Sequence, residues 1–86
     1  GIDAADDSER VRFLPEAIAS VEAAMADGVP VLGYLHWSLL DNFEWMSGYG
    51  PRYGLVAVDR KTFKRSPKPS ARLFGDIARA GGTGVR

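Results

Sequence analysis

The sequence contains no cysteine, which excludes both a disulfide framework and a thiolate metal site. No apolar run approaches the roughly 20 residues that a membrane-spanning helix needs. A secretory signal peptide, with its basic and then apolar segments, does not open the chain. An excess of basic charge is also missing, because 11 Lys and Arg balance 11 Asp and Glu. Neither nucleic acid nor a membrane is therefore an expected partner, and a soluble cytoplasmic protein is the default expectation.

What is present is ordinary for a globular protein. The 86 residues are 45% hydrophobic and 26% charged. A chain of this length is long enough for one small domain with a single core. The chain opens on Gly1-Ile2-Asp3 without an initiator Met. We therefore expect either a processed start or a piece of a longer protein.

The first long element is predicted to be a helix from Ser8 to Ala26. Its apolar residues recur at three- and four-residue steps: Val11, Leu14, Ile18, Val21 and Met25. The charged residues Arg10, Arg12, Glu16 and Glu22 are expected mostly on the opposite, solvated side. Pro15 predicts either a kink or a helix that starts only near Leu14, because proline lacks the backbone donor of the helix interior. Gly28 is expected to end the helix in a left-handed conformation.

A short apolar segment, Val29–Leu35, is predicted to be a strand that is buried on both faces. Such strands are typical of parallel sheets, and the order helix, tight turn, buried strand is the repeating unit of α/β folds. A buried parallel strand needs neighbours on both edges, and this chain offers none. We therefore expect the neighbouring strands to come from another segment of polypeptide.

The second half of the chain predicts a hairpin and a last helix. Residues 46–52 form a glycine-rich loop, Tyr53–Val58 a strand, and Phe63–Arg65 a short return strand. An extended connector, 66–69, leads to a helix that Ser70 is expected to cap and that ends at Ala80. Residues 81–84 are expected to cap this helix and then fray. The basic residues from Arg60 to Lys68 are expected to form a solvated face of the hairpin.

The most informative stretch, residues 37–45, follows the predicted buried strand. It holds two indoles and a carboxylate, those of Trp37, Trp45 and Glu44. Indole faces stack on the C–H face of a sugar ring, and a carboxylate can accept hydrogen bonds from two adjacent hydroxyl groups. Ligands bind at the carboxyl ends of strands in α/β folds, so the stretch predicts part of a carbohydrate pocket. The alternative is two core aromatic residues and a surface carboxylate.

These residues carry a resemblance to glycoside hydrolase family 1, the β-glucosidases and β-galactosidases built on a (β/α)8 barrel. The matching stretches are Trp37-Ser38-Leu39-Leu40-Asp41-Asn42-Phe43-Glu44-Trp45, Gly48-Tyr49, Arg52-Tyr53-Gly54-Leu55, Val58-Asp59 and Arg65-Ser66-Pro67-Lys68-Pro69-Ser70-Ala71. Gly33-Tyr34-Leu35-His36-Trp37 and Phe74-Gly75-Asp76-Ile77-Ala78 are most similar to the archaeal and actinobacterial branch. The resemblance implies an α/β fold in which residues 1–86 are the C-terminal quarter of a TIM barrel. They would comprise the penultimate helix, the last barrel strand, the hairpin and the last helix, and no independent full domain.

By the same resemblance, four residues contact the sugar in the cleaved position. Trp37 looks like the platform under the ring, and Glu44 looks like the carboxylate that holds the O4 and O6 hydroxyls. Trp45 looks like the indole whose N–H reaches O3, and Tyr53 lies where the wall near O6 usually has Phe. Glu44 favours unphosphorylated β-glucosides or β-galactosides, because relatives that act on 6-phosphorylated sugars usually have Ser there.

The resemblance places no catalytic residue in this chain. It implies that the chain begins two residues after the nucleophilic Glu of a retaining mechanism and that the acid/base Glu lies further upstream. The isolated chain is therefore predicted to be inactive, its partners being the upstream remainder of the barrel and a β-linked sugar. No metal and no cofactor are implied.

Asp41, His36 and the chain as a whole each leave a second interpretation. Asp41 and Glu44 could mimic the carboxyl pair of a retaining glycosidase, about 5–5.5 Å apart, but the family pattern makes Asp41 a structural, hydrogen-bonded residue. His36 is expected to be packed rather than in contact with sugar. The alternative for the whole chain is a free-standing small carbohydrate-binding or structural module without catalysis.

Overall fold

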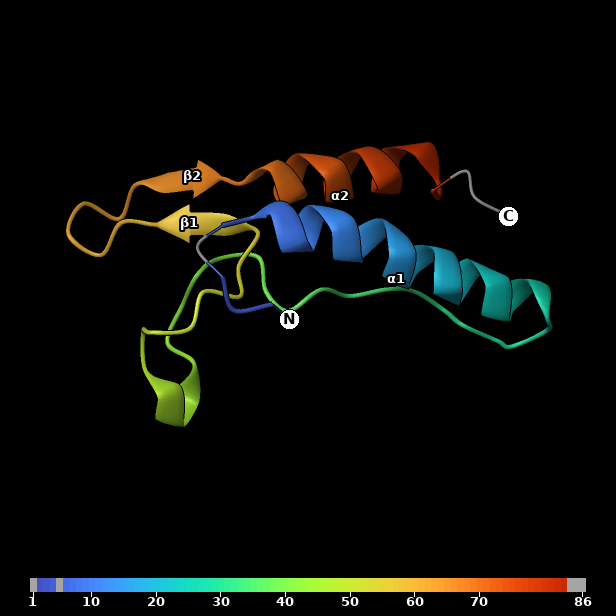
Figure 1. Cartoon of the computed structure of the whole chain (residues 1–86), viewed down its shortest axis with the longest axis horizontal. Coiled ribbons are helices and arrows are strands. Elements are labelled where there is room, and N and C mark those ends of the chain that lie inside the picture. The colour runs from blue at the N-terminus through green and yellow to red at the C-terminus, as the bar shows by residue number, and fades with distance from the viewer. Residues whose placement is uncertain (1, 5, 84–86) are drawn as a thin grey trace.

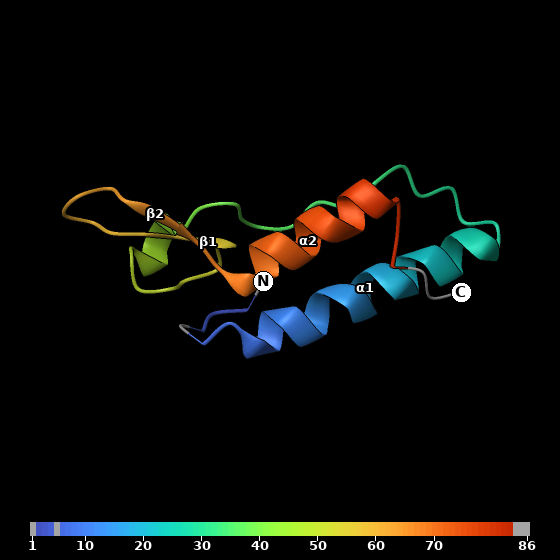
Figure 2. The same cartoon turned by 90° about the horizontal axis from the view of Figure 1, so that it is seen from above.

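The structure, a computed structural model, describes residues 2–4 and 6–83. Its elements follow in the order α1 (Ser8–Ala26), η1 (Trp45–Ser47), β1 (Val56–Val58), β2 (Arg65–Pro67) and α2 (Pro69–Ala80). The arrangement is elongated, 46 × 26 × 19 Å, with the two helices side by side and the hairpin continuing the line of α2 (Figure 1). Seen from above, α1 and α2 run in the same direction (Figure 2). Neither helix is long and apolar enough to cross a membrane within the described ranges.

Helix α1 has the predicted bounds. It begins at Ser8 and continues through Pro15, so the alternative start near Leu14 is wrong. Of the predicted apolar stripe, Leu14 and Ile18 are buried, whereas Val11 and Met25 are exposed. At the other end, Gly28 has φ +93° and donates to the Met25 carbonyl at 3.0 Å, as the predicted left-handed cap requires.

Helix α2 is capped from outside its own sequence. It begins at Pro69, whose missing N–H is not needed in the first turn. Ser70 is therefore not the N-cap, and that prediction was wrong. The carboxylate of Asp7 instead accepts the Ser70 N–H at 2.6 Å and its hydroxyl at 2.8 Å. The Asp7 carboxylate stabilises the start of α2, because the positive end of a helix favours an anion. Asp7 directly precedes α1, so it joins the starts of the two helices. Gly84, predicted to fray, is outside the described residues.

The predicted hairpin is confirmed with shifted bounds. Strands β1 and β2 pair antiparallel, with Val56 opposite Pro67 and Val58 opposite Arg65. β1 is shorter than the predicted strand Tyr53–Val58, and β2 begins two residues later than the predicted strand Phe63–Arg65. Residues 59–64 form the turn, where the Asp59 carboxylate accepts the Lys61 N–H at 2.8 Å.

The prediction of a buried strand at Val29–Leu35 is not met within this chain. The segment has no strand pairing among the described residues and returns past the two helices as an irregular trace (Figure 1). Leu32 and Leu35 are 102% and 96% exposed. The reason is physical: a strand needs a neighbour to pair with, and the described residues provide none here.

The core is correspondingly thin. The buried apolar residues of the described ranges are Leu14, Ile18 and Leu55. An open groove of about 580 Å³ separates the two helices from the returning segment. Its apolar lining includes Ile18, Val21, Met25, Tyr34, Phe74 and Ile77. The chain thus leaves one continuous apolar face uncovered by its own described residues.

Candidate functional site

The stretch from Trp37 to Trp45 is held by the backbone that leads into β1. Ser38 donates its N–H to the Tyr53 carbonyl at 3.4 Å and accepts the Leu55 N–H at 2.9 Å. Three residues later, the Asp41 N–H reaches the Val56 carbonyl at 3.0 Å. These bonds run in the parallel sense, and the peptide bond between Trp37 and Ser38 is cis. The backbone that begins the stretch is therefore fixed to the backbone of residues 53–56.

Asp41 anchors the middle of this stretch. Its buried Oδ1 accepts the Gly54 N–H at 2.8 Å and Lys68 Nζ at 3.1 Å. Lys68 also donates to the Gly54 carbonyl at 2.7 Å, and the guanidinium of Arg60 donates to the Asp41 carbonyl. Asp41 is thus confirmed as a structural, hydrogen-bonded residue. An oxygen that already accepts from an amide and an ammonium is a poor partner for Glu44 in catalysis.

The prediction of a solvated basic face holds for only part of the hairpin. Lys61, Lys64 and Arg65 are exposed. Lys68 is not, because its side chain is only 10% exposed and is ion-paired with Asp41. Arg60 is exposed as well, although its guanidinium carbon lies 4.4 Å from the ring centre of Tyr49. Charge alone did not distinguish Lys68 from its solvated neighbours.

Glu44 has the environment of a binding carboxylate. The residue is only 9% exposed, which contradicts the alternative of a surface carboxylate. Its Oε1 accepts the indole N–H of Trp37 at 3.0 Å. Its Oε2 is buried and has no hydrogen-bond partner within the described residues. An unsatisfied buried acceptor costs about 1–3 kcal/mol, and more when it is charged, so this oxygen is suited to accept from a ligand.

The two indoles are available at the surface rather than packed in the core. Trp37 and Trp45 are 58% and 81% exposed, which contradicts the alternative of two core aromatic residues. Trp45 begins η1 with a positive φ of 52°. The Glu44 N–H closes this turn on the Gly48 carbonyl at 2.7 Å. The turn therefore places an exposed indole directly after the buried carboxylate.

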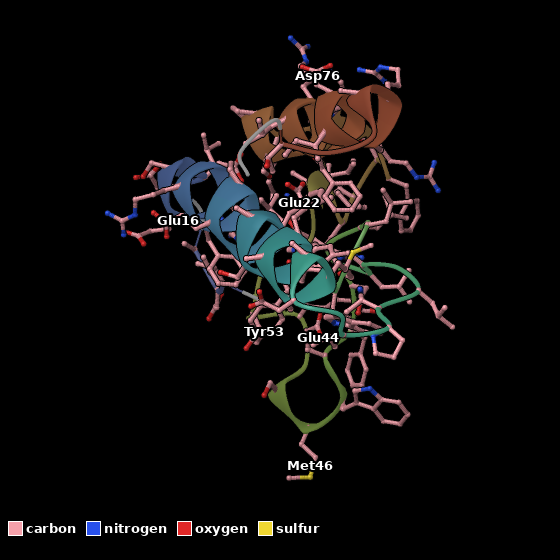
Figure 3. All side chains as sticks on the ribbon, turned by 90° about the vertical axis from the view of Figure 1, so that its right-hand side faces the viewer. Glu16, Glu22, Glu44, Met46, Tyr53 and Asp76 are labelled. Carbon is pink, nitrogen blue, oxygen red and sulfur yellow. The ribbon has the colours of Figure 1, made fainter. Side chains whose placement is uncertain are left out.

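Tyr53 reaches the same region through its backbone. Figure 3 shows Glu44 and Tyr53 at the base of the loop that carries Met46, on the side away from Asp76 of α2. The hydrogen bond from Ser38 to the Tyr53 carbonyl ties this residue to the start of the tryptophan stretch. All four sequence-predicted residues thus lie on two neighbouring segments.

Supporting residues that the sequence did not single out complete the loop. Asn42 donates to the Leu40 carbonyl at 2.7 Å and to the Ser38 hydroxyl at 3.1 Å. Phe43 packs edge-to-face on Tyr49, with ring centres 5.2 Å apart. The mixture of polar and aromatic residues in 38–49 could have predicted a loop. It could not have predicted which residues of the loop contact each other.

His36 is packed, as predicted. Its Nε2 lies 3.3 Å from the Tyr53 carbonyl, and its ring centre lies 6.4 Å from that of Phe74. Burial lowers the pKa of His36, against the opposing effects of the Tyr53 carbonyl and the Asp7 carboxylate. The positive charge of Arg10 lowers this pKa further.

This lowered pKa predicts a pH-dependent stability. Below the unfolded-state pKa of about 6.5 the unfolded chain binds more protons than the folded one. The free energy of unfolding should therefore fall as the pH drops through 6.5 toward the folded pKa, and stay flat above about pH 7.5. Urea unfolding between pH 5 and 8 would measure this, with His36→Asn expected to remove the slope near pH 6. An unchanged slope in the variant would assign the dependence to another group.

Comparison with known proteins places these features in a family. The sequence profile of glycosyl hydrolase family 1 matches residues 2–83. β-Glucosidase 44 of Arabidopsis thaliana is 48% identical over 71 residues, which cover 83% of this chain. A β-galactosidase of Sulfolobus acidocaldarius is 45% identical over 76 residues, or 88% of this chain. Plant and archaeal relatives match at similar identity, so the branch stays a prediction.

Solved structures match at the level of the fold. The apo structure of β-glucosidase 1317 superposes on the whole chain with a TM-score of 0.92 and 55% identity, and the match covers 21% of that structure. A Thermotoga maritima β-glucosidase in complex with glucoimidazole matches 88% of this chain with a TM-score of 0.86 and 42% identity, which is 17% of that structure.

The chain spans only 14% and 16% of the length of the two curated relatives named above. The profile nevertheless covers nearly all of it, and the identities lie well above those of chance similarity. The chain belongs to glycosyl hydrolase family 1.

Proposed function

We propose that this chain is the part of a retaining β-glycosidase barrel that binds the sugar to be cleaved. The main support is the environment of the Glu44 carboxylate. One of its oxygens accepts the Trp37 N–H, and the other is buried without a partner in the described residues. The exposed indoles of Trp37 and Trp45 supply apolar faces beside it. Family membership and the likeness to a β-glucosidase bound to glucoimidazole support a sugar as the ligand.

Each residue has a distinct role in the proposal. The Trp37 N–H holds the Glu44 side chain in one orientation, so that Oε2 faces the ligand without an orientational search. Oε2 accepts from sugar hydroxyls through charge-assisted bonds, which are stronger than neutral ones. Trp37 and Trp45 contact the ring, and Tyr53 closes the wall. These bonds strengthen as the ring distorts toward the transition state, so the segment aids catalysis without itself transferring a proton.

The proposed substrates are unphosphorylated β-glucosides or β-galactosides. A phosphate at O6 would bring two negative charges close to the buried Glu44 carboxylate, and like charges repel strongly where water is excluded. The names of the relatives, a β-glucosidase and a β-galactosidase, are compatible with both sugars.

The proposal also assigns both working carboxylates to polypeptide outside this chain. Asp41 is committed to Gly54 and Lys68, and Glu44 is committed to Trp37. The open apolar groove and the unpaired segment 29–35 are the surfaces on which the rest of a barrel would pack. This uncovered face favours the barrel segment over the free-standing module.

The test uses two proteins. One is the 86-residue chain alone, and the other is a chimera in which this chain replaces the matching segment of the Thermotoga maritima β-glucosidase. We expect the chimera to hydrolyse an aryl β-glucoside and to bind glucoimidazole, and the isolated chain to show no turnover. Turnover by the isolated chain would refute the assignment of the catalytic groups. A chimera that folds but does not bind glucoimidazole would refute the sugar-binding role, and sugar binding by the isolated chain would favour the free-standing module.

A further inference from the structure

Arg10 is the most deeply buried charged residue of the described chain, although the helical pattern assigned it to solvent. It has no exposed surface. Its Nη1 donates to the Asp7 carboxylate at 3.1 Å, the same carboxylate that caps α2. Its Nη2 donates to the carbonyls of Ile2 at 2.6 Å and Ala4 at 2.8 Å. The guanidinium therefore joins the first residues of the chain to the starts of both helices.

The same guanidinium reaches the loop that precedes the candidate site. Arg10 Nη2 also donates to the carbonyl of Arg52. The N–H of Arg52 donates to the Asp3 carboxylate at 2.8 Å. Both backbone groups of Arg52 are thus held by residues more than forty positions away in the sequence. Because both backbone groups of Arg52 are held, the position of the next residue is held as well.

The next residue is Tyr53, which the proposed function places in the wall of the sugar site. Its carbonyl accepts the Ser38 N–H at 3.4 Å and faces His36 Nε2 at 3.3 Å. Ser38 follows Trp37, whose indole orients Glu44. A continuous path therefore runs from Asp3 and Arg10 to the carboxylate that we propose binds the sugar. Its links alternate between hydrogen bonds and peptide bonds between adjacent residues.

We propose that Asp3 and Arg10 are positioning residues of the sugar site. They hold the two peptide groups on either side of the Arg52 Cα and so fix Tyr53 and the Trp37–Ser38 backbone against each other. Arg suits position 10 because its planar fork directs Nη1 to the Asp7 carboxylate and the two N–H groups of Nη2 to the converging carbonyls, whereas Lys is a single point charge. This inference rests on the proposed function, since it concerns the geometry of that same site.

The two clamping residues differ in how a substitution would act. Loss of the Arg10 side chain would leave the buried Asp7 carboxylate without its cation, so folding itself would suffer. Asp3 is exposed, and its bond to Arg52 is a single contact near the surface. Asp3 is therefore the position at which positioning can be separated from stability.

The test measures glucoimidazole affinity, KM, kcat and the unfolding midpoint of the chimera for Asp3→Ala and Asp3→Asn. Asp3→Ala should weaken glucoimidazole binding and raise KM about 5- to 10-fold, with little change in the midpoint. Asp3→Asn keeps an oxygen that accepts the Arg52 N–H and should restore most of the affinity. The matched control is Asp6→Ala. It removes another exposed carboxylate of the same segment, which accepts the Ser8 N–H and makes no bond to Arg52. It should leave affinity unchanged.

A double-mutant cycle identifies the path. In a Tyr53→Ala background, Asp3→Ala should cause a smaller further loss of affinity, because the side chain that it positions is gone while the Tyr53 carbonyl still bonds Ser38. Arg10→Lys, which keeps the charge beside Asp7, should weaken binding more than Asp3→Ala does.

Three results would overturn the inference. Unchanged affinity in Asp3→Ala would do so, as would a loss that is fully additive with Tyr53→Ala. A loss of affinity that only follows a fall in the unfolding midpoint, with no rescue by Asp3→Asn, would show a purely structural role. If the parent chimera folds but does not bind glucoimidazole, the proposed function fails, and this inference fails with it.

Discussion

Glu44→Gln in the chimera should weaken glucoimidazole binding by roughly 30- to 150-fold, equivalent to about 2–3 kcal/mol. The substitution preserves size and leaves an oxygen that can still accept the Trp37 N–H. It replaces Oε2, which has no hydrogen-bond partner in the described part of the chain, by an amide nitrogen, which donates and cannot accept. The charge-assisted bonds to two sugar hydroxyls are lost, while the fold is retained. Isothermal titration with glucoimidazole measures the affinity, and thermal unfolding reports the fold.

The variant also separates a binding role from a catalytic one. If the bonds to Glu44 strengthen in the transition state, kcat should fall along with affinity. Activity should remain measurable, because Glu44 is neither nucleophile nor proton donor in the proposed mechanism. Glu16→Gln, on the exposed side of α1, is the matched control and should change neither quantity. An unchanged affinity in Glu44→Gln, with the control intact, would remove the main support for the site.

The elements with a strong local code could be predicted from the sequence. The bounds of α1 followed from its apolar stripe, and Gly28 ended it as expected. The hairpin followed from two β-rich runs around a polar turn, although its strands shifted by a few residues. Local patterns suffice where the deciding interactions lie within a few residues of each other.

Long-range partners could not be predicted in the same way. Arg10 was assigned to solvent because a helical wheel records only polarity. It does not show that two carbonyls from the preceding segment and one from 42 positions away converge on this residue. The cap of α2 was assigned to Ser70 because the true capping acceptor, the Asp7 carboxylate, is 63 positions away. Val29–Leu35 was predicted as a strand from its apolarity, which reports the need for burial and not the presence of a neighbour.

The candidate site divides along the same line. The motif predicted Trp37, Glu44, Trp45 and Tyr53 as residues that contact the sugar, and the structure brings them together on two neighbouring segments. It did not predict that the Trp37 N–H would donate to Glu44 Oε1, so that only Oε2 is without a partner among the described residues. Nor did it predict that Lys68, directly before α2, would form an ion pair with Asp41. Residue identity follows from chemistry, but orientation depends on contacts that only the folded chain brings together.

Gly54→Ala should destabilise the chimera by about 3 kcal/mol and weaken glucoimidazole binding as well. A methyl group at this position would lie 2.3 Å from the Asp41 nitrogen and 2.5 Å from the Leu40 carbonyl carbon. Both are backbone atoms, so no side-chain rotation relieves the contact, and the segment 38–41 must move away from residues 53–56. Denaturant unfolding measures the loss of stability, and titration with glucoimidazole measures the loss of affinity.

The matched control for this glycine is Gly75→Ala in the interior of α2. There the nearest atom to a new methyl is a terminal nitrogen of Arg79 at 3.2 Å, on an exposed and flexible side chain. Alanine is also the better helix former, so this variant should be more stable than the parent by about 0.5–1 kcal/mol. Equal effects at the two positions would contradict a steric role for Gly54. A stability loss at Gly54 without any loss of affinity would show that Trp37 and Glu44 keep their places when the 38–41 backbone shifts. The geometry of the site would then not depend on the pairing of residues 38–41 with residues 53–56.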